Sequence, residues 1–250
     1  MRSEGPEALQ RNSMFGEMTP LPRGPHRLSR EEVQASQRTR LLTAIVDLVA
    51  ERGYADTTIT AIARKAGVSP NVFYEHFADR EACFVTAYDA FTATLFERMS
   101  RLVPSAPKWD DFINGMLESY FGLLEEEPNA ARAFLVEIES AGPRARARRR
   151  SAYLTAAAFL HEQHDALRRQ DPSLGPLPQL AFIGFVHATR DLACDVLEYE
   201  PETGLRALIP DLAEWITASF YGAAAIGATT RPSRPATTGA TTRGGRSSAR

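Results

Sequence analysis

Several hydrogen-bonding side chains lie close together in residues 57–80, TTITAIARKAGVSPNVFYEHFADR. Asn71 can pair with the edge of an adenine through two hydrogen bonds, and Ser69 can bond a base edge or a phosphate. Tyr74 and His76 can donate to phosphate oxygens, as can backbone N–H groups at the start of a helix. These residue types indicate binding to nucleic acid. The alternative is the polar face of an ordinary helical protein.

The spacing of small and apolar residues in the same stretch predicts two short helices joined by a tight turn. A helix-turn-helix needs a small residue where the helices touch, which Ala63 supplies. It also needs a residue that tolerates a positive φ in the turn, which Gly67 supplies four positions later. Val68 and Phe73 can hold the second helix against the first. The first residues of that second helix would then face a major groove.

Two other polar clusters could bind a metal ion. His161 and His164 lie three residues apart next to Asp165, and His187 lies in a second cluster with Asp191, Cys194 and Asp195. Neither cluster has the spacing of a zinc motif, so we predict no metal and no cofactor. The sequence also shows no nucleophile–base pair and no glycine-rich phosphate loop, and we therefore predict that the protein is not an enzyme.

Helical periodicity accounts for most of the chain, and strand-like alternation appears nowhere, so we predict an all-α fold. Ser29 and Glu32 have the spacing of a capping box at the start of the first helix, and Asp79 can cap the fourth. We expect a disordered arm at 1–28, a helix-turn-helix domain at 29–78, a helical regulatory and dimerisation domain at 79–227, and a disordered basic tail at 228–250.

The charge distribution separates the predicted domains. Residues 1–80 contain 11 Lys and Arg against 10 Asp and Glu, residues 81–227 contain 13 against 21, and residues 228–250 contain 5 against none. An acidic middle region therefore lies between a near-neutral head and a basic tail, which permits a polyanionic partner at the head. No apolar run approaches the ~20 residues of a membrane span, and no secretory signal is apparent, so we expect a cytoplasmic protein with no membrane partner.

The stretch from Leu41 to Cys83 resembles the N-terminal domain of the tetracycline-repressor (TetR) family of transcriptional regulators. Many positions agree with the family pattern in one register, which makes the match specific. These positions are Gly53-Tyr54, Thr57-Thr58-Ile59, Ile62-Ala63, Ala66-Gly67-Val68-Ser69, Tyr74-x-His76-Phe77 and Asp79-Arg80. Beyond this stretch, the chain matches the family only in its helical character and its length.

The resemblance implies that the DNA-contacting residues lie on the two short helices and just after them. They are Thr58, Thr60, Ser69, Pro70, Asn71, Val72, Tyr74, His76 and Arg80. Asn71 stands where many members have Gly, so the operator sequence is expected to differ. Arg80 stands where Lys is common and keeps a cation for phosphate contact. Ala61 stands where an acidic residue often completes a capping box with Thr58.

The resemblance further implies a homodimeric repressor that binds a palindromic double-stranded DNA operator and is released by a small-molecule effector. The last two long helices, at about 178–200 and 205–225, would pair with their copies in the dimer. An effector pocket in the helical body could be lined by Phe91, Phe96, Met99, Trp109, Phe112, Met116, Tyr120 and Phe134. A transcriptional activator, a non-specific DNA-binding protein and a helical enzyme are the alternatives.

Two basic segments lie outside the predicted helix-turn-helix. Residues 21–30, LPRGPHRLSR, are interpreted as a solvated linker, with entry into a minor groove as the alternative. Residues 144–150, RARARRR, are interpreted as a solvated helix start, although cations at a helix N-terminus oppose the macrodipole.

Overall fold

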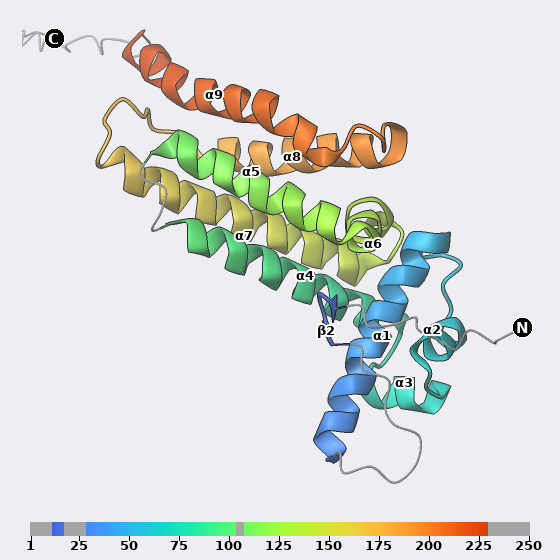
Figure 1. The fold of residues 1–250 in the computed structure, drawn as a ribbon. Coiled ribbons are helices and arrows are strands. Elements are labelled where there is room, and N and C mark those ends of the chain that lie inside the picture. Colours follow the sequence, from blue (N-terminus) through green and yellow to red (C-terminus); the bar gives the residue numbers. More distant parts are fainter. Residues whose placement is uncertain (1–11, 18–28, 104–107, 230–250) are drawn as a thin grey trace, which may run out of the picture.

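The computed structural model describes residues 12–17, 29–103 and 108–229, and over these residues the fold is helical (Figure 1). The helices of the N-terminal domain are α1 (Arg30–Arg52), α2 (Ile59–Ala66) and α3 (Pro70–His76). The body contains α4 (Arg80–Leu102), α5 (Trp109–Glu126), α6 (Pro128–Ala131), α7 (Pro143–Arg168), α8 (Gln179–Tyr199) and α9 (Ile209–Thr229). The predicted all-α fold, with a three-helix N-terminal domain followed by a helical domain, is confirmed.

Short irregular helices interrupt the body at two places. The chain after α6 continues as a π-helix, η2 (Arg132–Val136), and a 3₁₀ helix, η3 (Glu137–Glu139). A second 3₁₀ helix, η4 (Leu205–Leu208), leads directly into α9. The sequence predicts one continuous helix over residues 128–139, whereas the structure changes its hydrogen-bonding pattern twice there. Such π segments often lie at functional sites.

A small hairpin forms within the segment that the sequence predicts to be disordered. Strands β1 (Asn12–Ser13) and β2 (Gly16–Glu17) pair in an antiparallel register. The carbonyl of Phe15 accepts a hydrogen bond from Thr39 Oγ1 at 3.1 Å, and the backbone N–H of Met14 donates to Glu127 Oε1 at 3.2 Å. The disorder expected for residues 1–28 is therefore wrong for residues 12–17. The expected linker at 21–30 lies almost wholly outside the described residues, as do residues 230–250 of the predicted tail.

Helices α1, α2 and α4 begin where their local capping residues predict. Ser29 and Glu32 make both bonds of a capping box, at 2.7 and 3.1 Å. Thr58 Oγ1 accepts from the N–H of Ala61 at 3.2 Å, and Asp79 Oδ1 accepts from the N–H of Ala82 at 2.8 Å. Each side chain satisfies a backbone donor that the first turn of a helix leaves unpaired.

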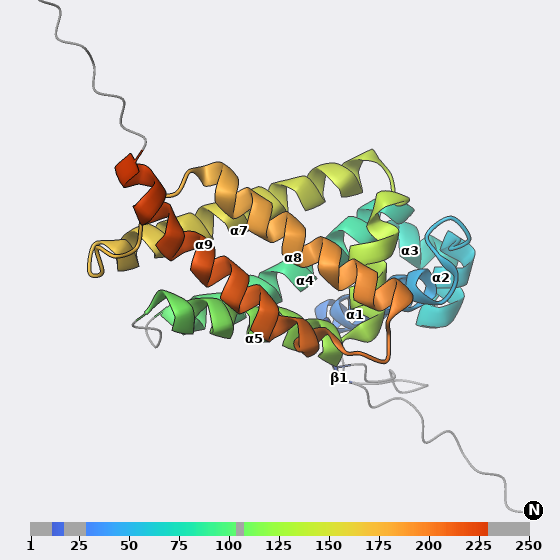
Figure 2. The same cartoon turned by 90° about the horizontal axis from the view of Figure 1, so that it is seen from above.

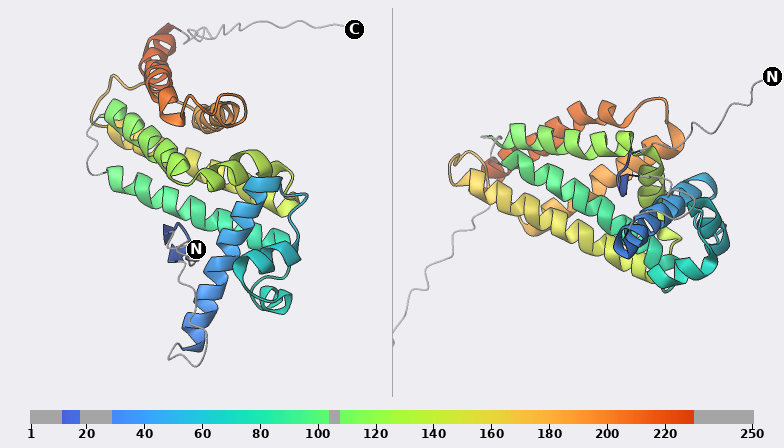
Figure 3. Two further views of the ribbon diagram at one scale, coloured as in Figure 1. Left: turned by 45° about the vertical axis from the view of Figure 1, so that its right-hand side comes forward. Right: turned by 60° about the horizontal axis from the view of Figure 1, so that its bottom comes forward.

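The body is layered. Helices α4, α5 and α7 lie roughly alongside one another, and α8 and α9 cover them on one side (Figures 1 and 2). Helix α8 packs on α7, and α9 packs on α5. A second pair of views shows α8 and α9 as the outermost layer, on the side of the body away from the N-terminal domain (Figure 3).

The basic run at 144–150 joins the body to the N-terminal end of α4. Arg144 bonds through its side chain to Glu81 at 2.9 Å and to Asp79 at 2.6 Å. Glu81 Oε1 also accepts the backbone N–H groups of Arg144 and Ala145, at 2.7 and 3.1 Å, and so caps α7 with a carboxylate from another helix. Further ion pairs of the run are Arg148–Asp89 and Arg149–Glu139. The interpretation of a solvated helix start is therefore wrong for Arg144, Arg148 and Arg149, which pair with carboxylates at the start of α4, within it and on η3, whereas Arg146 and Arg150 are exposed as expected.

The body holds a buried histidine whose titration makes stability depend on pH. His164 has no exposed surface, and its ring lies 5.0 Å from that of Trp109 and 5.5 Å from that of Phe182, centroid to centroid. Burial lowers the pKa of His164 from 6.5 to about 4, against the opposing effect of Asp165. Since the folded pKa lies below the unfolded one, the unfolded chain binds this proton first. The stability that depends on the neutral ring is therefore complete above about pH 7 and is lost as the pH falls towards 4.

We predict that this histidine alone lowers the free energy of unfolding by about 2 kcal/mol between about pH 7 and pH 5. Urea unfolding of the wild type and of His164→Gln at both pH values measures it. Most carboxylates stay ionised in this window, and His76 contributes equally to both proteins. The wild type should lose about 2 kcal/mol more than the variant on acidification. Equal losses in the two proteins would contradict the prediction.

Candidate functional site

The turn between α2 and α3 has the geometry that its sequence predicts. Gly67 adopts φ 67° and ψ 37°, a left-handed conformation that side chains with a Cβ rarely adopt. Its N–H donates to the carbonyl of Arg64 at 3.1 Å, and the N–H of Val68 donates to that of Ala63 at 2.9 Å. Ala63 is fully buried where the two helices meet. Arg40 of α1 secures the turn by donating from Nη1 to the carbonyl of Ala66 at 2.9 Å.

Helix α3 has one buried face and one exposed face. Ser69 caps it by accepting the N–H of Val72 at 3.4 Å, and Pro70 occupies the first turn, where its missing N–H costs nothing. Phe73 has no exposed surface and anchors the helix in the core. On the opposite side, Asn71 is exposed and Tyr74 keeps 58% of its surface accessible. The helix therefore presents its polar N-terminal residues outward from a fixed position.

The structure brings most of the predicted contact residues to the region of the two short helices. Thr58 and Thr60 are exposed at the start of α2, and Ser69 and Pro70 are exposed at the start of α3. Val72 is half-buried and offers only part of its surface.

His76 is half-buried at the end of α3 and is held by α1. Its Nε2 lies 3.2 Å from Gln37 Oε1. Burial and then the nearby Arg38 cation lower the pKa of His76, so the ring is neutral near pH 7. The contact with Gln37 occupies one ring nitrogen of His76, so only Nδ1 is left for a bond to DNA. Gln37 was not singled out from the sequence, because only the packing of α1 on α3 brings it to His76.

Arg80 points back into the domain. Its Nη1 lies 2.9 Å from the carbonyl oxygen of Tyr54 and 3.3 Å from that of Ala55, and it also donates to the carbonyl of Thr57. The guanidinium carbon lies 4.0 Å from the centroid of the Tyr54 ring. These contacts fasten the α1–α2 connection to the first residue of α4. The side chain expected to contact phosphate is thus engaged in the turn.

We predict that Arg80→Met lowers the free energy of unfolding by about 2 kcal/mol, because partly buried carbonyls lose a charged donor and the Tyr54 ring loses its cation. The stability of Arg80→Lys should lie between those of the wild type and Arg80→Met, since an ammonium keeps the charge but lacks the planar guanidinium. Denaturant unfolding measures both, with Arg64→Met on the exposed face of α2 as the control for losing a surface cation. The prediction would be contradicted if Arg80→Met kept its stability but bound DNA more weakly and with less dependence on salt. That result would support Arg80 as a phosphate contact.

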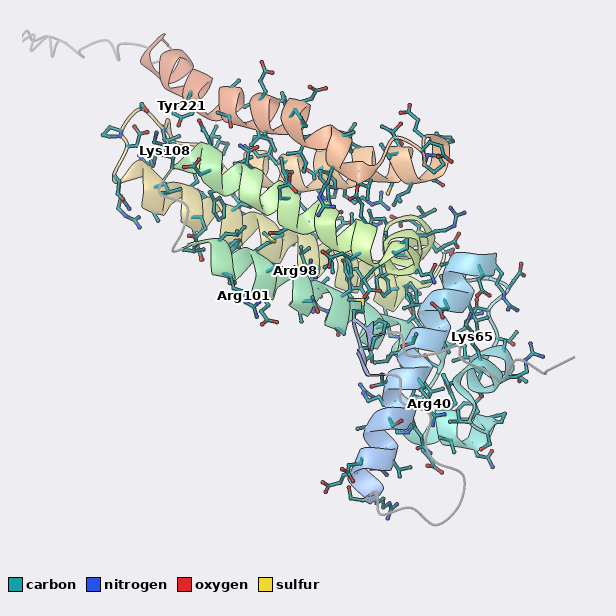
Figure 4. All side chains as sticks on the ribbon, in the orientation of Figure 1. Arg40, Lys65, Arg98, Arg101, Lys108 and Tyr221 are labelled. Carbon is teal, nitrogen blue, oxygen red and sulfur yellow. The ribbon has the colours of Figure 1, made fainter. Side chains whose placement is uncertain are left out.

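Other cations of the N-terminal domain are already engaged within it. Arg40 and Lys65 both lie on this domain (Figure 4). Arg40 bonds the turn, while Lys65 pairs with Glu51 at 2.5 Å and with Asp47 at 3.6 Å. Arg64, next to Lys65, is exposed on α2 and makes no side-chain ion pair within the described chain. It is a candidate phosphate contact that the sequence argument did not single out.

A cavity of about 100 Å³ lies in the body between α4, α5, η2, α7 and α8. Six of the eight side chains proposed from sequence line it, namely Phe91, Phe96, Met99, Met116, Tyr120 and Phe134. Trp109 and Phe112 do not, because they pack against each other and the His164 region as core. Lining residues that sequence analysis missed include Tyr88, Tyr153, Thr189 and Arg190.

The two histidine clusters have other partners in the fold. His161 Nδ1 lies 2.6 Å from Gln179 Oε1, and its ring stacks on Phe182 at 4.7 Å. His187 packs edge-on against Tyr153. Within the described residues, no group of three or more His, Cys, Asp or Glu side chains is arranged to hold a metal ion. Cys83 and Cys194 are both buried and free.

No helix in the described part of the chain combines the length and the apolar character that crossing a membrane requires.

Residues 41–87 match the family model described as "Bacterial regulatory proteins, tetR family". The chain is also similar in fold to solved regulators. The fatty acid degradation regulator FadR from Bacillus halodurans has 15% identity and a TM-score of 0.64, with 71% of this chain and 96% of that chain covered. FadR from Bacillus subtilis in complex with stearoyl-CoA has 18% identity and a TM-score of 0.65, with the same coverage.

A putative transcriptional regulator from Pseudomonas aeruginosa PAO1 has 21% identity and a TM-score of 0.63, covering 79% of this chain and 94% of that chain. At these identities the solved structures establish the fold. The match at residues 41–87 covers α2, α3, about half of α1 and the start of α4, and so includes the turn and the exposed face of α3. The resemblance of the sequence to the TetR family is therefore confirmed.

Proposed function

We propose that this TetR-family protein is a homodimeric repressor that binds a palindromic DNA operator through α3 and leaves it when a small molecule occupies the body cavity. The observation that carries the proposal is the exposed start of α3. There Ser69 and Asn71 face outward from a helix fixed by buried Phe73 and the Gly67 turn. Side chains at the start of a recognition helix contact base edges in the major groove.

The outer face of α8 and α9 supports the dimer. Phe182, Phe185 and Ile216 point into the chain's own core. Leu180 and Trp215, on α8 and α9 respectively, keep 73% and 46% of their surface exposed. Exposed large apolar side chains on adjacent helices are typical of a surface that another copy covers. A two-fold dimer would place two α3 helices about one DNA turn apart, and hence on a palindrome.

The cavity supports an effector. It lies inside the body, and part of its wall is Phe134 and Leu135 of η2. The next element, η3, reaches the N-terminal domain, where Glu137 Oε2 accepts the backbone N–H of Tyr54 at 3.1 Å. From α6, Asn129 donates to Asp47 of α1 at 2.8 Å. The segment 128–139 thus touches both the cavity and α1, and α4 runs between the same two regions.

We predict that Glu137→Ala leaves both DNA binding and effector binding measurable but weakens effector-induced release, by roughly threefold or more. The reason is that the carboxylate links the cavity wall to the end of α1. The control is Glu125→Ala, which removes a carboxylate that bonds Arg206 instead. Release should be measured by displacement of labelled operator. If Glu137→Ala still binds operator and effector and its release is unchanged, the prediction is wrong. Helix α4 would then be the remaining connection between the cavity and the N-terminal domain.

The proposed function is tested by selecting bound sequences from a random duplex pool at about 150 mM salt, which suppresses binding through phosphates alone. A palindromic consensus, with two chains per duplex, is the expected result. Well-folded protein that enriches no sequence would refute operator recognition and favour non-specific binding. A consensus that enhances transcription from a neighbouring promoter would replace repression with activation.

A further inference from the structure

The cavity has two chemically different ends. Helices α4 and α7 start at the N-terminal domain and run away from it, while α5 and α8 run back towards it (Figure 1). The lining residues far from the domain are apolar, and include Leu95, Phe96, Met99, Met116 and Leu160. Those nearer the domain include five residues with polar groups, Tyr88, Tyr120, Tyr153, Thr189 and Arg190, set among apolar residues such as Phe134, Leu135 and Ala152. A molecule filling the cavity would therefore meet apolar side chains at one end and hydrogen-bonding groups at the other.

Three tyrosine hydroxyls gather at the polar end. Tyr88, Tyr120 and Tyr153 come from α4, α5 and α7 respectively, and all three line the cavity. Burial raises the pKa of all three, so each hydroxyl is a neutral donor at physiological pH. None of these hydroxyls is hydrogen-bonded to another group of the described residues. They are donors available to a ligand's oxygen atoms.

Arg190 adds a cation to this end. Its Nη1 bonds Asp191 at 2.8 Å, and its Nη2 donates to the carbonyl of Leu135 in η2. Its Nε is shielded from solvent and has no hydrogen-bond partner within the described chain. The side chain is only 17% exposed, whereas that of Asp191 is 63% exposed. Asp191 can therefore turn into solvent while Arg190 stays at the cavity.

The surrounding charges balance before a ligand binds. Glu139 lies 4.0 Å from Arg190 and also pairs with Arg149, and Asp191 is the second carboxylate. Two cations thus face two carboxylates, of which Asp191 makes the closer contact with Arg190 and has the more exposed side chain. An incoming carboxylate could take the place of Asp191 beside Arg190 and accept bonds from the tyrosine hydroxyls as well. Bonds between a guanidinium and a carboxylate are stronger than those between neutral groups.

We propose that the effector is a carboxylic acid with an apolar tail, its head held by Arg190 and the three tyrosines and its tail directed away from the N-terminal domain. The regulatory role of this ligand rests on the proposed function. Its binding site is inferred from the cavity alone and does not depend on that function. The head would lie against Leu135 of η2, the segment that continues to Glu137 and Tyr54.

The size of the cavity limits the tail. A volume of about 100 Å³ is smaller than the ~150 Å³ of an engineered cavity that holds benzene. The head and a few carbons fit without change. A longer tail must displace Met99 and Met116, whose unbranched thioether side chains adapt readily to new shapes. The fit therefore favours short to medium chains over long ones.

Calorimetric titration of the full chain with sodium hexanoate, octanoate and decanoate, and with the matching primary alcohols, tests the proposal. The acids should bind at least about tenfold more tightly than the alcohols of equal length, because only the acids use the charged bond to Arg190. Tyr153→Phe should weaken octanoate binding by about threefold to tenfold and leave octanol nearly unchanged. Tyr221→Phe, whose hydroxyl lies outside the cavity lining, is the matched control and should bind octanoate normally.

Arg190→Lys keeps the charge and should retain part of the preference for acids, provided that circular dichroism shows a native fold. Equal binding of acids and alcohols, or no binding of either, would overturn the proposal. Binding of octanoyl-CoA but not of octanoate would overturn it too, because the recognised head would then lie outside the cavity.

The outcomes separate this inference from the proposed function. A palindromic consensus from the duplex selection, together with indifference to carboxylic acids, would reject the ligand class and keep the regulator. Acid binding that depends on Tyr153, by a protein that selects no DNA sequence, would keep the ligand class and reject the regulator.

Discussion

Replacing Phe73 by alanine is expected to lower the free energy of unfolding by about 3–5 kcal/mol, the range for truncating a fully buried phenylalanine. The ring has no exposed surface and lies 5.7 Å from the Phe77 ring, centroid to centroid. Helix α3 has only seven residues, too few to be stable without tertiary contacts. Loss of this anchor should therefore release the helix that carries Ser69 and Asn71.

The measurement is denaturant unfolding followed by far-UV circular dichroism. Tyr74→Ala is the matched control, because Tyr74 is the next residue on the same helix but remains 58% exposed. It should change stability by about 0.5 kcal/mol or less, as surface substitutions usually do. Similar losses from the two substitutions would mean that α3 is not anchored through Phe73. Phe73→Leu should recover much of the loss, since it keeps most of the apolar volume.

Local signals explain why the helix starts and the turn could be predicted from the sequence. The caps at Ser29, Thr58 and Asp79 each bond a backbone N–H three residues on, so the pattern and the contact lie in the same short stretch. Gly67 is similar, because its positive φ is a property of one residue. These features depend little on the rest of the chain.

Contacts between distant segments could not be predicted in the same way. The carbonyl acceptors of Arg80 lie 23 to 26 positions earlier in the chain, and Glu81 caps a helix that begins more than 60 residues later. From residue type alone, Arg80 could equally contact a phosphate, and Glu81 and Arg144 could equally be solvated. Only packing of α4 against the α1–α2 connection and α7 decides between those roles.

The cavity shows the same limit for apolar residues. Phe91 lines it and Phe112 does not, although both are aromatic and buried on long helices. Periodicity predicts that each residue lies on the inner face of its helix. It does not predict where the packing between helices leaves a cavity. The polar end was missed for a related reason. Of the three tyrosines, only Tyr120 lies among the aromatic residues expected to line a pocket, and the sequence around Arg190 marks His187 and Asp191 as a possible metal site instead.

Asn71→Ala is expected to cost the largest loss of operator affinity, given the proposed function. A bidentate bond between asparagine and adenine contributes about 1–3 kcal/mol of discrimination. Because a two-fold dimer makes the contact twice, the loss should reach about 2–6 kcal/mol, or roughly 30-fold to 10⁴-fold in affinity. Asn71 is exposed, and the capping of α3 depends on Ser69 instead, so stability should change little.

Binding should be measured on the selected consensus and on a duplex with one base pair changed, over a range of salt concentrations. A base contact predicts that Asn71→Ala weakens binding, abolishes discrimination at one position in each half-site and leaves the salt dependence unchanged. Arg64→Ala is the complementary variant. As a phosphate contact, it should weaken binding to both duplexes alike and reduce the salt dependence by about one ion per chain. If Asn71→Ala behaves like Arg64→Ala, then α3 contacts the DNA backbone there, and base recognition must come from Ser69 or from other side chains at the start of the helix.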